Sequence, residues 1–65
     1  MNEYVYVIQV NPKGGQSRVS SEAYKTLGQA QAFIENRSDK PEKFSEFIYE
    51  SEENLYLIFQ LKIFN

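Results

Sequence analysis

The sequence predicts an α+β fold in which one helix packs on one face of a four-stranded sheet. Three observations predict it: strand-like runs occupy residues 4–10 and 55–64, one amphipathic segment lies between them, and turn-forming residues separate the segments. A chain of 65 residues buries enough surface for one modest core. We therefore expect a single domain over residues 1–65.

The first half of the chain predicts a hairpin. Residues 4–10 are rich in β-branched and aromatic side chains and are apolar on both alternating faces, which is typical of a strand with a neighbour on each side. Asn, Pro and two Gly in residues 11–15 favour a turn. Residues 16–24 are mostly polar with weak alternation, which predicts an edge strand.

A helix is expected to begin at about Leu27. Residues 26–29, Thr-Leu-Gly-Gln, match a capping box, in which the Thr hydroxyl accepts from a backbone amide and the Gln side chain reaches back. Pro41, within a polar connection over residues 36–43, cannot continue the helix. Apolar residues recur at spacings of three and four: Leu27, Ala30, Phe33 and Ile34.

The last third of the chain predicts two more strands, over residues 44–50 and 55–64. One face of the final strand is uniformly apolar, and we expect the helix to cover it: Leu55, Leu57, Phe59 and Leu61. Because the first and last strands are the most apolar, we expect them to be central and parallel, giving the order 2-1-4-3. A meander with the last strand at an edge is the alternative.

Composition excludes several classes of function. The chain has no Cys and no His, so it cannot form disulfides or the usual zinc sites, and most acyl-transfer chemistry lacks its usual residues. We therefore predict no enzymatic activity, no cofactor and no metal. The start resembles no signal peptide and no apolar run could span a membrane, which we interpret as a cytoplasmic product.

The predicted binding residues lie on the sheet face away from the helix. If Val5 and Val7 point inward, the outward residues form a tyrosine-rich patch with Lys62 at its end: Tyr4, Tyr6, Tyr56 and Ile58. Tyrosine provides a large, rigid contact area, so this patch predicts a protein-interaction module that forms a homodimer or binds an unidentified protein. The competing interpretation is that the tyrosines are partly inside and the outer face merely tolerates apolar atoms.

Nucleic-acid binding is a second hypothesis for the same patch. The three tyrosines could stack bases while Lys13, Arg18 and Lys62 neutralise phosphates. A net charge of −2 disfavours this hypothesis because no bulk positive field attracts the phosphates.

The helix entrance also carries a resemblance. Thr26-Leu27, Ala30 and Phe33-Ile34, set between two hairpins, resemble small uncharacterised β-β-α-β-β proteins of phages and mobile elements of low-GC Gram-positive bacteria. The resemblance implies modulation of a host protein and transfers no functional residue.

Overall fold

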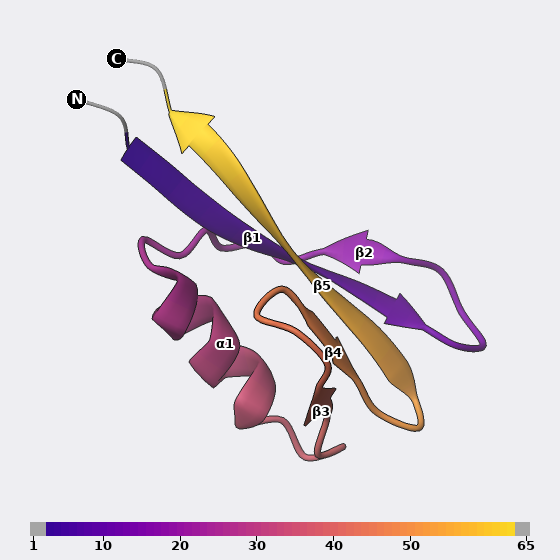
Figure 1. Cartoon of the computed structure of the whole chain (residues 1–65). Coiled ribbons are helices and arrows are strands. Elements are labelled where there is room, and N and C mark those ends of the chain that lie inside the picture. Colours follow the sequence, from indigo (N-terminus) through magenta and orange to yellow (C-terminus); the bar gives the residue numbers. More distant parts are fainter. Residues whose placement is uncertain (1–2, 64–65) are drawn as a thin grey trace.

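The computed structural model describes residues 3–63, and within them the chain forms one helix and five strands (Figure 1). The sheet order is β2-β1-β5-β4-β3, and every neighbouring pair is antiparallel. The α+β class with a single helix is thus confirmed, whereas the count of four strands is wrong. The elements are β1 (Glu3–Pro12), β2 (Arg18–Val19), α1 (Leu27–Glu35), β3 (Glu42–Lys43), β4 (Ile48–Glu50) and β5 (Asn54–Ile63).

The centre of the sheet is the long ladder between β1 and β5. Ten residue pairs join them, from Glu3 opposite Ile63 to Pro12 opposite Asn54. The central position of these two strands agrees with the prediction, but their parallel orientation was wrong. Helix α1 connects β2, at one edge of the sheet, to β3 and β4 on the other side of the β1–β5 ladder. A tight turn then joins β4 to β5, which run antiparallel, so β4 has the same direction as β1 without being its neighbour.

Both outer strands are shorter than predicted. In the second strand the ladder is interrupted at Ser20, whose hydroxyl accepts from the Ile8 amide at 3.2 Å. Pairing resumes only at Tyr24, which exchanges two 2.8 Å backbone hydrogen bonds with Tyr6. Of the predicted third strand over residues 44–50, only Ile48–Glu50 is a strand, and it forms a small hairpin with β3, in which Glu42 pairs with Glu50.

Helix α1 begins where the sequence predicts. Thr26 Oγ1 accepts from the amide of Gln29 at 3.1 Å, as a helix cap requires. The Gln29 side chain accepts from the amide of Lys25, one residue before the position that a capping box uses. At the other end, the backbone and side-chain N–H groups of Asn36 both donate to the Ala32 carbonyl.

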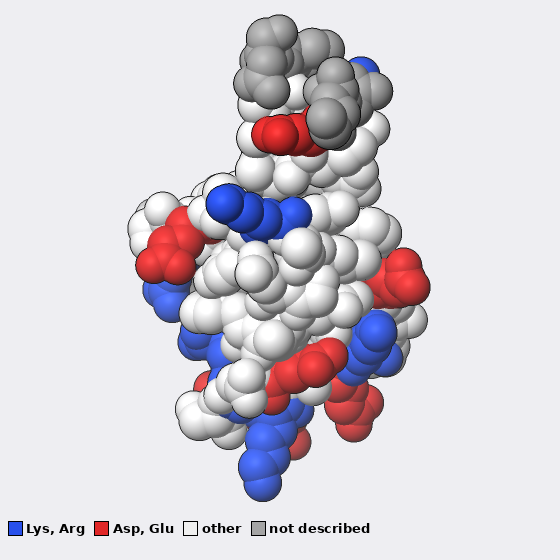
Figure 2. All heavy atoms as spheres, turned by 90° about the vertical axis from the view of Figure 1, so that its left-hand side faces the viewer, with Lys and Arg blue, Asp and Glu red and all other residues white. Residues whose placement is uncertain are grey.

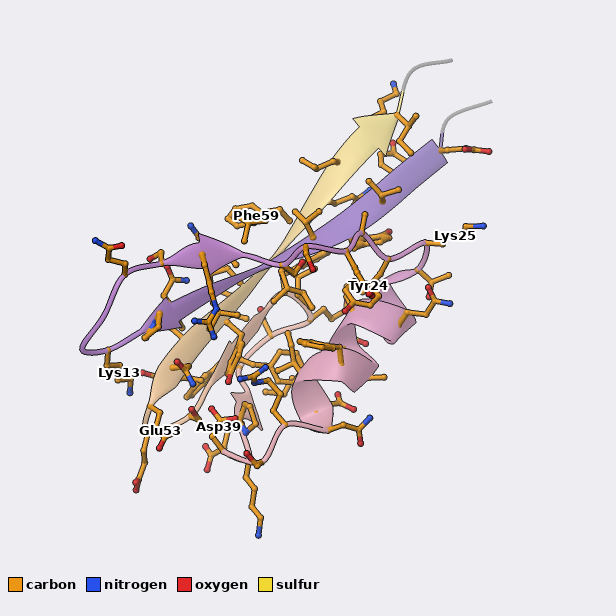
Figure 3. The ribbon with its side chains drawn as sticks, turned by 180° about the vertical axis from the view of Figure 1, so that it is seen from behind. Lys13, Tyr24, Lys25, Asp39, Glu53 and Phe59 are labelled. Carbon is orange, nitrogen blue, oxygen red and sulfur yellow. The ribbon has the colours of Figure 1, made fainter. Side chains whose placement is uncertain are left out.

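The core lies between α1 and the sheet, on the face opposite to the one predicted. Its buried residues are Ile8, Val10, Ala30, Ile34, Tyr49, Tyr56 and Ile58. The helix therefore covers Tyr56 and Ile58 instead of the uniformly apolar face of β5. Figure 3 shows Phe59 on the side of the sheet away from α1, while Tyr24 lies beside the helix.

The hydroxyl of Tyr56 explains this inversion. It donates to Asp39 Oδ2 at 2.7 Å and accepts from Arg37 Nε at 2.8 Å and from Asn54 Nδ2 at 3.1 Å. A buried tyrosine needs a partner for its hydroxyl, and these three contacts provide it. The mixed face of β5 can therefore turn inward, leaving the aliphatic face outside.

Candidate interaction surface

The outward face of the central ladder is apolar. Because Ile8 and Tyr56 point towards α1, strand alternation directs Val7 and Phe59 to the other side, where they are register partners. Phe59 is 44% exposed, and Leu61, opposite Val5, is 48% exposed.

The two neighbouring strands extend this surface. Val19 of β2 lies opposite Gln9 and is 59% exposed, and Ile48 of β4 lies opposite Leu57 and is 39% exposed. Adjacent strands thus contribute apolar side chains to one continuous surface. We call it the open face, formed by Val5, Val7, Gln9, Val19, Ile48, Leu55, Leu57, Phe59 and Leu61.

Charged residues lie at the ends of the open face. Glu50 occupies a register position beside Leu55, and its carboxylate forms a 2.8 Å ion pair with Lys13. Glu42 is the neighbour of Glu50 on β3, and Glu3 lies at the far end of the ladder. An apolar centre with a polar rim is typical of protein-interaction surfaces.

The structure does not bring the predicted binding residues together on this face. Tyr56 and Ile58 are core residues, 0% and 5% exposed, and Tyr6 is half-buried against the core. Tyr4 and Lys62 are exposed cross-strand partners on the helix side of the sheet. The tyrosine-rich outer patch was therefore wrong as a geometric prediction.

Phe59 and Leu61 are the exposed residues that the sequence interpretation placed in the core. Their signal was present in the sequence, since every second residue from Leu55 to Leu61 is apolar. Such alternation establishes that a face is apolar, but it does not identify what covers that face.

A buried polar cluster on the helix side has a structural role. Asp39 Oδ2 accepts from Ser51 Oγ at 2.5 Å and from Asn54 Nδ2 at 3.0 Å, in addition to the Tyr56 hydroxyl. Burial alone would raise the pKa of Asp39, but the hydrogen bonds from Ser51, Tyr56 and Asn54 outweigh it and lower the pKa to about 2. Asp39 is thus a satisfied carboxylate that joins the segment after α1 to β5.

A second hydroxyl–carboxylate contact fastens the helix to β4. The Tyr49 hydroxyl donates to Glu35 Oε2 at 2.5 Å, and Tyr49 is 1% exposed. Burial and the carboxylate together raise the pKa of Tyr49, because both disfavour the phenolate. Tyr49 therefore stays a neutral hydrogen-bond donor, which is a packing role.

The remaining surface is mixed in charge. Figure 2 shows Lys and Arg interspersed with Asp and Glu around an uncharged central area. Within residues 3–63, no group of three His, Cys, Asp or Glu side chains is arranged to hold a metal ion. The helix described in the same range is too short and too polar to cross a membrane.

Comparison with known proteins does not assign the chain to a family. No family model, curated protein or solved structure matches the chain. The resemblance to small phage and mobile-element proteins stays a prediction from the sequence.

Proposed function

We propose that the chain is a non-enzymatic protein-interaction module whose open face binds the open face of a second copy. The observation that carries this proposal is the exposure of Val19, Ile48, Phe59 and Leu61 on one side of the sheet. Contiguous apolar patches on soluble proteins mark contact sites, because leaving them in water is unfavourable.

A second copy suits this face for reasons of shape and charge. Sheets pack face to face when each offers an apolar surface, and a twofold axis brings the same surface from both copies. The resulting arrangement has four layers, with the two sheets inside and the two helices outside. The ion pair of Lys13 and Glu50 neutralises charge at one rim, so the two copies meet without strong repulsion.

Two of the three tyrosines on which the nucleic-acid hypothesis depends are not free to stack bases. Base stacking requires rings with accessible faces, but Tyr56 is completely buried and Tyr6 is half-buried. The exposed ring of the open face, Phe59, lies among aliphatic side chains of β1 and β5. This environment supports protein contact.

Phe59→Thr is the direct test, with Gln60→Thr as its matched control. Gln60 is the next residue of β5 and points to the other side of the sheet, so the control introduces the same side chain outside the proposed contact. The exposed 44% of Phe59 amounts to about 90 Å², or about 2 kcal/mol per copy. Allowing for the area of Thr, and counting both copies, we expect Phe59→Thr to weaken the dimer about a hundredfold.

Sedimentation equilibrium and size-exclusion chromatography with light scattering measure this effect. The wild type and Gln60→Thr should form dimers at high micromolar concentration, and Phe59→Thr should stay monomeric. Thermal unfolding at low concentration checks that the variants fold. If Phe59→Thr does not fold, Leu61→Thr is used for the same test. A wild type that is monomeric throughout, or equal dimerisation of the Phe59 and Gln60 variants, would reject the proposal.

A further inference from the structure

A groove of about 560 Å³ lies on the helix side of the sheet, with Val19 of the open face at its edge. It is bounded by the β2 segment and the residues that follow it on one side and by the end of α1 on the other. The residues that matter for its chemistry are Val10, Arg18, Glu22, Tyr24, Phe33 and Arg37.

Arg37 is held in a fixed position at this groove. Its guanidinium carbon lies 5.4 Å from the ring centre of Tyr56 and 5.8 Å from that of Phe33. Its Nε donates to the Tyr56 hydroxyl, and its side chain is 32% exposed. A guanidinium has five N–H donors, and within residues 3–63 only the Nε donor of Arg37 has a hydrogen-bond acceptor.

The nearest carboxylate does not use these remaining donors. Asp39 Oδ1 is 3.7 Å from Arg37 Nε, and Asp39 Oδ2 is occupied by Ser51, Asn54 and Tyr56. Arg37 therefore presents ordered donors that the described part of the protein leaves unfilled.

Arg18 adds a second positive charge from a different element. It lies on β2 opposite Val10, on the helix side of the sheet, and is exposed. The structure shows no ion pair for its guanidinium among residues 3–63. Two carboxylates lie near the two arginines: Glu22 in the lining of the groove, and Asp39 in an ion pair with Arg37. The attraction for an anion therefore comes from the guanidinium donors that have no acceptor among the described residues, and not from an excess of positive charge.

An apolar wall lies next to the two arginines. The rings of Tyr24 and Phe33 are 5.9 Å apart at an interplanar angle of 40°, and Phe33 is 40% exposed. Val10 lies behind them in the core. The groove thus combines a flat apolar surface with planar cationic donors.

We propose that this groove binds an organic anion in which a phosphate or carboxylate is attached to a flat apolar body. Arg18 and Arg37 hold the anionic group, because guanidinium donors match its oxygens in pairs. Tyr24 and Phe33 contact the apolar body. Among residues 3–63, Val19 is the one residue that this groove shares with the open face, and the four side chains that bind the anion lie outside the proposed dimer contact.

The two-part recognition can be tested with small probes. Phenyl phosphate and benzoate carry both features, whereas inorganic phosphate lacks the ring and benzyl alcohol lacks the charge. For a ligand of about eleven non-hydrogen atoms, a dissociation constant in the low millimolar range is expected, about 1–10 mM. Titrations followed by two-dimensional NMR detect binding at this strength and identify the residues whose signals shift.

Phenyl phosphate should shift the signals of Tyr24, Phe33 and Arg37 saturably, and inorganic phosphate or benzyl alcohol should bind at least tenfold more weakly. If benzoate and phenyl phosphate have equal dissociation constants, the groove is a general site for aromatic anions. If one of them binds more tightly, its anionic group is the one that the groove prefers. Arg18→Gln should weaken phenyl phosphate about tenfold, whereas Lys43→Gln, with the same charge change on β3 at the opposite edge of the sheet, should have little effect.

Arg37→Lys keeps the charge and should still weaken binding, because Lys lacks the planar fork of donors. Arg18→Gln tests the site without disturbing the core, since the Arg18 side chain is exposed. The proposal is overturned if no probe gives saturable shifts, if inorganic phosphate equals phenyl phosphate, or if Arg18→Gln and Lys43→Gln weaken binding equally.

Discussion

Replacing Tyr56 by Phe removes one hydroxyl from the core and tests what turns the mixed face of β5 inward. With the hydroxyl, the protein loses its 2.7 Å hydrogen bond to the Asp39 carboxylate and the two hydrogen bonds that it accepts from Arg37 and Asn54. Hydrogen bonds to charged groups contribute about 1.5–3 kcal/mol, and unpaired buried partners add to the loss. Asp39 keeps Ser51 and Asn54 as donors, so we expect a total loss of about 3 kcal/mol in the free energy of unfolding.

That loss is large for a domain of this size. At about 0.05–0.15 kcal/mol per residue, a chain of 65 residues has a stability of about 3–10 kcal/mol. Urea unfolding followed by circular dichroism measures the difference. Tyr4→Phe is the control, because Tyr4 is 40% exposed and its hydroxyl has no hydrogen bond within the described residues. If Tyr56→Phe cost no more than Tyr4→Phe, the hydroxyl contacts would not be the reason for the inward face.

Two further predictions concern the helix start and the acid limb of stability. Thr26→Ala removes the acceptor for the Gln29 amide and should lower the free energy of unfolding by about 1 kcal/mol. Ser38→Ala, at an exposed position, is the control and should change it little. Equal urea midpoints for the two variants would refute the contribution of the cap. The pKa of Asp39 is lowered from 3.8 to about 2, so its contribution to stability is present above about pH 4 and is lost as the pH falls towards 2. Asp39→Asn should therefore flatten that part of the stability–pH curve, and an unchanged slope between pH 4 and 2 would contradict this.

The sequence predicted the order of the main elements because their signals are local. The Thr26 cap, the apolar spacing from Leu27 to Ile34 and the alternation along β5 each involve neighbouring residues, and the elements they predict are present. The split of residues 42–50 into a hairpin depends on pairing between Glu42 and Glu50, which strand propensity does not encode.

The inward face of β5 could not be predicted because its cause is distant in sequence. Tyr56 is acceptable in the core only when Asp39 and Arg37, from the segment after the helix, meet its hydroxyl. Hydrophobic alternation ranks Leu55, Phe59 and Leu61 above Tyr56 and Ile58 and gives the opposite face. The predicted binding surface was wrong for the same reason: it contained the tyrosines, whereas the exposed apolar face contains Phe59 and Leu61.

The β1–β5 ladder also has a consequence for how the molecule assembles. Its ten pairs join residues from opposite ends of the described chain, so most of the loop-closure entropy must be lost before the central contacts form. Strand β1 has no central neighbour until residues 54–63 have been made, and β4 pairs with the same segment. Folding of this domain is therefore expected to wait for residues 54–63, to be slow for its size and to be all-or-none, with no stable intermediate lacking β5.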